Sequence, residues 1–403
     1  MAASSSTLAP RGMLDRFLES AATVHTPTLG GMHDVTTWFE ERTERNSFTI
    51  TQIPFAELNG WSFAPGTGDL VHASGGFFKI RGLSVHDPAG IVPKWTQPII
   101  HQPEVGVLGI LVKEIDGVLC LLMQAKMEPG NINMLQLSPT VQATRSNFLR
   151  LHGGAATKYL EYFTEPGRGT VLTDVLHSEQ GGRFFRKRNR NIIVETTEDV
   201  PLDDDFRWFT LGQVHELLRQ DNMVNMDTRT VLSCLPMHTS ARSLDLPETE
   251  IGPAVVESFL QHPEPAEIQN WLNHVKGHCQ LTAELVPLDA IGQWKKTETE
   301  IAHEEGRYFE VIATSVRATN REVRSWSQPL IAPCGQGLVA FAASRARGYL
   351  EVLLQARVEA GTPDVVELGP TVQCMPENYL HRAPEHRPPF LDAVLAAPPA
   401  DIK

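Results

Sequence analysis

The chain has 403 residues, of which 41% are apolar and 21% are charged, and its formal net charge is −13. These values suit a globular protein of two or three domains, and the negative charge argues against a nucleic-acid-binding surface. The N-terminus lacks the apolar core of a signal peptide, and no apolar run approaches the ~18–20 residues of a membrane helix. Five scattered cysteines without a CxxC pair indicate reduced thiols. We therefore expect a cytoplasmic protein without nucleic-acid or membrane partners.

The predicted elements begin with an N-terminal arm, residues 1–51. Its segments 13–20 and 33–46 have the apolar spacing of helices. From residue 52, short strands alternate with Gly/Pro turns, and residues 106–127 predict a hairpin around Asp116-Gly117. A strand is expected over 134–143, and a short helix or loop follows it.

Further along, residues 182–197 predict a strand pair or hairpin. Amphipathic spacing over 210–220 and 226–235 predicts two helices. A Pro- and Ser-containing stretch at 236–250 is typical of a linker, and 251–280 predicts two more helices.

The sequence contains an internal repeat. Residues 95–142 align without a gap with 326–373 at an offset of 231, and 17 of these 48 positions are identical. Unrelated sequences would share roughly three. The pattern predicts an arm (1–51), a first module (52–235), a linker with a helical pair (236–285) and a second module (286–403). The offset would end the second module near 235 + 231 = 466, so about 466 − 403 = 63 residues are missing and we expect a truncated module.

Common cofactor signatures are missing from the sequence. We find no GxGxxG after a strand, no Walker lysine loop, no GxSxG and no HExxH, and the 15 histidines show no ligand spacing. We therefore expect neither a metal nor an organic cofactor.

Polar residues alternate along the predicted strand 134–143. Side chains two apart on a strand share a face, so four of them could line a pocket or a solvated surface: Gln136, Ser138, Thr140 and Gln142. Two recur in the second module, as Thr371 and Gln373, which favours the pocket.

The segment after that strand, residues 144–148, offers groups that bind phosphate or sugar oxygens. Arg145 can form paired hydrogen bonds with a diphosphate, and its neighbours Thr144, Ser146, Asn147 and Phe148 complete the candidate site. A polar helix start is the alternative. A basic run that includes Arg183 could hold an anion, but the pattern favours a solvated hairpin.

Tryptophan at a loop edge can stack on a planar base. Trp61 follows a glycine in LNGWSF, and Trp294 is its approximate counterpart in the second module. A buried structural role is the alternative for both.

Long motifs in this chain resemble the NDP-hexose 2,3-dehydratase family of deoxysugar and antibiotic biosynthesis: LNGWSFAPGTGDLVH, WTQPIIHQPEVGVLGILVKEIDGVL, LQLSPTVQATRSN and HSEQGGRFFRKRNRN. The resemblance implies an α+β fold of two tandem Nudix-like modules, each a mixed sheet flanked by helices, in a homodimer. It also implies the substrate dTDP-4-keto-6-deoxy-D-glucose, no required metal or nicotinamide, and a 3-ketoreductase that takes the product. The shortened second module departs from the family pattern.

The implied reaction removes water across C2–C3 and gives a 3,4-diketo-2,6-dideoxy sugar. It requires a base, an acid and donors to an enolate oxygen. The candidates are Lys126, Glu128 and His177, and the first two share strand parity, so they could pair. An exposed hairpin end is the alternative for these two residues. A Nudix-type hydrolase and a non-catalytic sugar-nucleotide-binding module remain alternatives.

Overall fold

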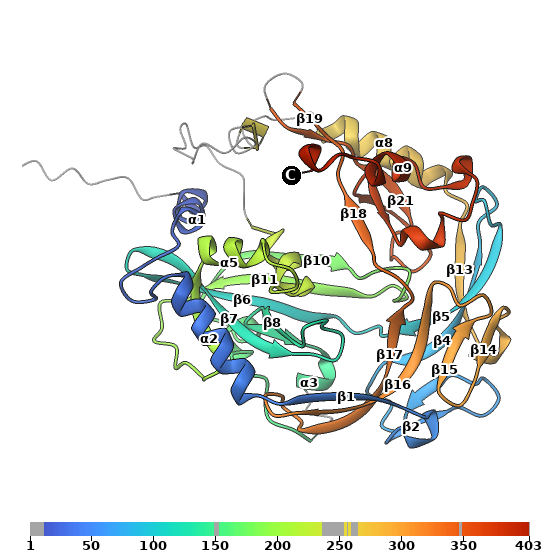
Figure 1. The fold of residues 1–403 in the computed structure, drawn as a ribbon, viewed down its shortest axis with the longest axis horizontal. Coiled ribbons are helices and arrows are strands. Elements are labelled where there is room, and N and C mark those ends of the chain that lie inside the picture. Colours follow the sequence, from blue (N-terminus) through green and yellow to red (C-terminus); the bar gives the residue numbers. More distant parts are fainter. Residues whose placement is uncertain are drawn as a thin grey trace, which may run out of the picture.

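The computed structural model describes residues 12–148, 153–235, 254–255, 257–258, 265–345 and 349–402. It is an α+β fold, rich in sheet (Figure 1). Two helices open it, α1 (Met13–Ala22) and α2 (Met32–Arg45), in the segments where helical spacing predicts them. The expected linker at 236–250 lies outside the described residues, as does most of the first helix expected in 251–280. The second of those helices is present as α8 (Pro265–His278).

The largest sheet has seven strands and is mixed. Its order is β10 (Thr170–Ser178), β11 (Arg188–Glu195), β6 (Gly106–Ile115), β7 (Val118–Met127) and β12 (Phe206–Thr210), with β8 (Leu135–Ser138) on β7 and β9 (Val141–Ala143) on β6. β11 runs parallel to β6, and the other pairs are antiparallel. The expected β6–β7 hairpin is confirmed, and Asp116 and Gly117 have φ of 54° and 78°, as a type I′ turn requires.

Helices cover both faces of this main sheet. Side chains alternate between the faces, so β6 and β7 contribute to two cores. One core includes Phe17 of α1, Phe39 of α2, and residues of α5 (Leu211–Leu218) and α6 (Met226–Leu232). The other includes Tyr162 and Phe163 of α4 (Glu161–Thr164). The amphipathic spacing at 210–220 and 226–235 therefore correctly predicts two helices.

Two smaller sheets share one topology. The first has the order β13 (Thr282–Val286), β4 (Lys79–His86), β3 (Leu70–His72) and β2 (Trp61–Phe63), with β5 (Lys94–His101) on β4. The second has the order β1 (Phe48–Ile53), β16 (Phe309–Ala318), β15 (Glu300–His303) and β14 (Trp294–Lys296), with β17 (Ser325–Pro333) on β16.

These two sheets exchange their first strands. β1 precedes the first small sheet along the chain but pairs with β16 of the second, and β13 precedes the second but pairs with β4 of the first. Figure 1 shows β1 leaving α2 and running across to β16. One hydrophobic core joins both sheets, with Trp61 and Leu70 from one and Ile301 and Phe309 from the other. The halves of the chain are therefore interlocked.

The end of the chain repeats pairings of the main sheet. Its strand pairs are β18 (Leu338–Ala340) with β23 (Val372–Cys374), β19 (Ala343–Ser344) with β20 (Glu351–Val352), and β21 (Gln355–Val358) with β22 (Val366–Gly369). The pair Leu338–Cys374 stands 231 residues after the pair Val107–Ala143, since 107 + 231 = 338 and 143 + 231 = 374. A short helix, α9 (Leu391–Leu395), follows.

The hairpin expected over 182–197 is wrong. Only β11 forms there, and its neighbours β10 and β6 are distant in the sequence from one another. The residues before β11 cross to the second half, where the Arg186 backbone N–H donates to the Gly361 carbonyl at 2.6 Å. A parallel partner 189 − 106 = 83 residues earlier leaves no local turn signal, because parallel strands need a long crossover.

Candidate active site

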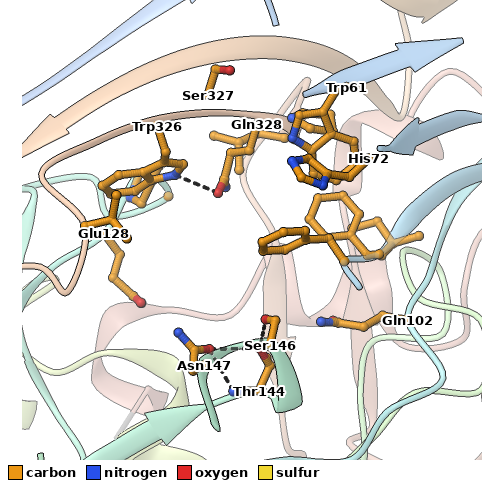
Figure 2. A pocket seen from close by; sticks show the side chains of 18 of the residues that line it. Trp61, His72, Gln102, Glu128, Thr144, Ser146, Asn147, Trp326, Ser327 and Gln328 are labelled. Carbon is orange, nitrogen blue, oxygen red and sulfur yellow. Dashed lines mark hydrogen bonds between the residues drawn. The ribbon is translucent and has the colours of Figure 1, made fainter. Parts of the chain in front are cut away.

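A pocket of about 740 Å³ lies where three parts of the chain meet (Figure 2). The main sheet and α3 (Arg145–Phe148) provide one wall, the first small sheet provides the aromatic wall, and the β16–β17 hairpin of the second half provides the third. The polar and charged side chains of its wall are Asn59, His72, Gln102, Glu128, Gln142, Thr144, Ser146, Asn147, Arg321, Glu322, Ser325, Ser327 and Gln328.

Glu128 follows β7 and is held by opposite charges. Lys126 Nζ lies 3.4 Å from Glu128 Oε1, so the pair that strand parity suggests does form. The Lys126 side chain is 4% exposed and lies behind the pocket wall, whereas that of Glu128 is 22% exposed and lies on it. The alternative of an exposed hairpin end is wrong, because the main-sheet core and the second half cover this end of β7.

Arg321, on the turn between β16 and β17, completes the ion pair from the other half of the chain. Its Nη1 donates to the Met127 carbonyl at 3.0 Å and lies 3.4 Å from Glu128 Oε1. Burial raises the pKa of Glu128, but Lys126, Arg321 and the Gln142 hydrogen bond outweigh it, so the pKa is lowered overall. Glu128 is therefore ionised near neutral pH.

Gln142 is the one member of the polar row 136–142 that lines the described pocket. Its Nε2 donates to both Glu128 oxygens, at 3.2 and 3.1 Å. The predicted strand is interrupted between β8, which pairs with β7, and β9, which pairs with β6. The expected common face of the four residues therefore does not form.

The repeated threonine has a structural role instead. Thr140 is buried, donates to the Leu122 carbonyl and accepts from the Leu111 N–H at 2.9 Å. Thr371 makes the same two contacts, with Leu353 and Ala342. Gln136 and Ser138 are also buried, and the Ser138 hydroxyl accepts a hydrogen bond from Asn225, the N-cap residue of α6.

The segment 144–148 forms a helix start that also faces the pocket. Asn147 Oδ1 accepts from the Thr144 N–H at 3.0 Å and from its hydroxyl at 2.8 Å, and the Thr144 and Ser146 hydroxyls are 2.7 Å apart. Thr144, Ser146 and Asn147 line the pocket, whereas Phe148 packs against a core of the main sheet. The backbone of Arg145 belongs to α3, and its side chain lies outside the described part of the structure.

The other end of the pocket is aromatic. Trp61 is 7% exposed and already has three aromatic neighbours, with ring centroids 5.3 Å away in His72, 4.9 Å in Phe78 and 6.3 Å in Phe77. Trp61 thus lines the pocket as part of a core, and the half-buried Phe77 offers more surface to a ligand. Figure 2 shows Trp61 and His72 across the cavity from Glu128.

His72 places a hydrogen-bond donor in the pocket wall that the sequence analysis does not predict. Its Nδ1 accepts the backbone N–H of Ser74 at 3.2 Å and lies 2.8 Å from the Ser74 hydroxyl. Burial lowers the pKa of His72, which favours the neutral ring. Because Nδ1 accepts, the proton of the neutral ring resides on Nε2.

Besides Lys126 and Phe148, four more candidate residues lie outside this pocket. His177, on β10, faces Cys234, with Nε2 and Sγ 3.5 Å apart, and burial lowers the histidine pKa. Arg183 lies over the Phe309 ring, 4.1 Å from its centroid. Trp294 repeats the setting of Trp61, with His303 at 5.5 Å and Phe309 at 4.8 Å, and Gln373 belongs to β23.

Sequence reasoning missed the wall contributed by β17. Trp326 Nε1 donates to Gln328 Oε1 at 2.8 Å, and Trp95 and Gln97 make the equivalent contact at 3.2 Å. Both pairs are identities of the internal repeat, which was the available signal. The position of Trp326 and Gln328 in the pocket with Glu128 depends on the contact between the halves, which the repeat does not specify.

Among the described residues, no group of three or more His, Cys, Asp or Glu side chains is placed to hold a metal ion. Within the same residues, no helix is long and apolar enough to cross a membrane. The pocket combines an ionised, doubly paired carboxylate with aromatic rings at the opposite end. This arrangement suits proton transfer on a ligand that carries a planar ring.

Comparison with known proteins identifies the family of this chain and agrees with proton-transfer chemistry. A family model described as NDP-hexose 2,3-dehydratase matches residues 32–235 and 265–403, so the chain belongs to this family. A Saccharopolyspora spinosa protein named dTDP-4-dehydro-6-deoxy-alpha-D-glucopyranose 2,3-dehydratase is 51% identical, over 100% of this chain and 84% of its own length. Proteins of the same name from Amycolatopsis orientalis and Streptomyces violaceoruber are each 49% identical, over 96% and 91% of this chain and 80% and 81% of their own.

A solved structure, a Nudix hydrolase from M. smegmatis, is 17% identical with a TM-score of 0.23 and covers 38% of this chain and 96% of its own.

Proposed function

We propose that this enzyme removes water across C2–C3 of dTDP-4-keto-6-deoxy-D-glucose, the substrate class named in its relatives. The observation that carries the proposal is the carboxylate of Glu128, held ionised by Lys126 and Arg321 on the wall of a 740 Å³ pocket. The product is a dTDP-3,4-diketo-2,6-dideoxyglucose.

The C4 ketone makes the C3 proton acidic, and Glu128 is the base that we assign to it. The C3–H electrons form an enolate with its charge on the C4 oxygen. That enolate expels the C2 hydroxyl, which leaves as water with the proton that Glu128 accepted. The enol then tautomerises to the diketone. Arg321 is the cation of the described wall and is suited to stabilise the enolate oxygen.

The nucleotide is proposed to occupy the rest of the pocket. The base would lie against Phe77 and the Trp61 edge, and the sugar and diphosphate oxygens would meet Thr144, Ser146 and Asn147. Binding of the distant base can orient the reacting ring, which lowers the barrier at the other end.

Exchanging Arg145 for Ala should weaken dTDP binding by ~1.5–3 kcal/mol, the range for one hydrogen bond to a charged group. Calorimetric titration of dTDP into a variant that melts like the parent measures this directly. An unchanged affinity would remove Arg145 from the site.

Arg321→Met should move the acidic limb of the kcat profile to higher pH. Glu128 must be ionised to accept a proton, and Arg321 is one of the charges that lower its pKa. Removing that charge raises the pKa, so activity is lost at a higher pH on acidification. Arg324→Met is the control, since Arg324 is an exposed arginine of the same turn. Equal profiles for both variants would contradict the base assignment.

We also propose that the two halves are tandem Nudix-like modules, that the protein acts as a homodimer, and that a 3-ketoreductase takes its product. The matched strand pairs at offset 231 support the first point. The vicinal diketone supports the last, because such a product is reactive and must be consumed quickly.

Mass spectrometry of the protein incubated with the 4-keto sugar nucleotide tests the function. An aromatic 1,2-diamine should be present to capture the vicinal diketone as it forms, and EDTA should be included in a parallel reaction. Loss of water from the sugar nucleotide supports the dehydratase. We expect this loss both with and without EDTA. Release of a nucleotide monophosphate would support the hydrolase, and an unchanged substrate the binding module.

A further inference from the structure

Asn225 sits behind the pocket wall, at the start of α6. It is 3% exposed, and its backbone N–H donates to the Leu137 carbonyl at 3.0 Å. Its side-chain Oδ1 accepts the Thr228 N–H at 2.8 Å, which caps the helix. Its Nδ2 donates to Ser138 Oγ at 3.0 Å and to Gln142 Oε1 at 3.4 Å.

These contacts determine the direction of a chain of hydrogen bonds. A backbone N–H can only donate, so Thr228 holds Asn225 with its oxygen toward α6 and its NH₂ toward β8 and β9. That NH₂ requires the Gln142 oxygen, so the Gln142 NH₂ points the opposite way, at both Glu128 oxygens. A flipped Gln142 would place its oxygen against a carboxylate and its NH₂ against another donor.

We propose that Asn225 is a positioning residue for the reaction: it holds Gln142 in the one amide orientation that donates to Glu128. The inference rests on the proposed role of Glu128, and Asn225 acts through Gln142 without reaching the pocket. It connects the fold of α6 to the protonation state of the base.

Other charged groups lie near Glu128, and they belong to three elements. Lys126 lies on β7, Arg321 and Glu322 on the β16–β17 turn, and Asp227 on α6. The pKa of Asp227 is raised to about 7 by burial and then by Glu128 and Glu179. A test variant should therefore remain uncharged, so that only the hydrogen-bond chain changes.

Asn225→Ser separates capping from positioning. Serine caps a helix as well as asparagine does, but its hydroxyl replaces the NH₂ that reaches Gln142. We expect kcat to fall about 10- to 100-fold, the range for one hydrogen bond to a charged group, with KM within about threefold. The pKa of Glu128 should rise, because a donor to its charged form no longer has a fixed orientation.

The decisive comparison combines Asn225→Ser with Gln142→Met. If Asn225 acts through Gln142, the double variant matches Gln142→Met alone in kcat. Ser138→Ala is the matched control, since it removes the other acceptor of the Asn225 NH₂ and leaves the Gln142 contact in place. It should keep kcat within about threefold of the parent. The bond that is lost joins two neutral buried groups, so its loss should lower the stability of the fold and leave the Asn225–Gln142 contact in place.

A ¹³C carboxyl titration of Glu128, assigned with Glu128→Gln, reads the same contact without substrate. A raised pKa in Asn225→Ser but not in Ser138→Ala supports the proposal even if the proposed reaction fails in the parent. An unchanged Glu128 pKa in folded Asn225→Ser overturns it. A kcat loss that adds in full to that of Gln142→Met also overturns it and leaves Asn225 a helix cap.

Discussion

Glu128→Gln should lower kcat for the elimination by about 10²–10⁴-fold, the usual contribution of a positioned acid–base group. The amide cannot accept the C3 proton, while its size and most of its hydrogen bonds persist. The dTDP affinity should change little, because the aromatic wall lies across the cavity. Single-turnover kinetics with the trapped diketone measure the chemical step.

Glu359→Gln provides the matched control, since Glu359 stands at the offset of 231 from Glu128. Its carboxylate accepts from the Gly181 N–H at 3.1 Å and pairs with Arg357. Glu359 does not line the 740 Å³ pocket. We expect turnover within about threefold of the parent, as for substitutions that touch no reacting atom. Losses of equal size in both variants would contradict the assignment of the reaction to the first half.

Cleaving the chain at an engineered protease site within 240–250 should leave two fragments that stay bound. β1 of the first fragment pairs with β16 of the second over six residue pairs, from Phe48–Ala318 to Ile53–Ala313. β13 of the second fragment pairs with β4 of the first from Thr282–His86 to Val286–Gly82. Separating the fragments would expose both sheet edges and a core that includes Phe55, Leu70 and Phe309.

Gel filtration after cleavage measures the association, and a denaturant step shows that the cut is complete. The cleaved protein should elute with the intact chain and keep its turnover, because the Arg321 wall and the Glu128 wall stay together. Each fragment expressed alone should aggregate, since half of a shared core stays exposed. Two separate, well-folded peaks would show that the strand exchange contributes little to the association.

Local and periodic signals in the sequence determined a good part of this protein. The repeat at offset 231, the Asp116-Gly117 hairpin and helices α1, α2, α5 and α6 all follow from spacing and turn chemistry. The pair of Lys126 and Glu128 follows from strand parity, because residues two apart lie on one side of a strand. The motifs that carry the family resemblance are also local.

The tertiary structure alone decided which distant segments meet. Backbone hydrogen bonds between strands carry no residue identity, so neither the exchange of β1 and β13 nor the β11–β6 pair could be inferred from the sequence. The same contacts bring Arg321 to Glu128 and place Arg183 and His177 elsewhere. Burial of the shared core selects among the possible pairings, and that free energy belongs to the whole chain rather than to any motif in it.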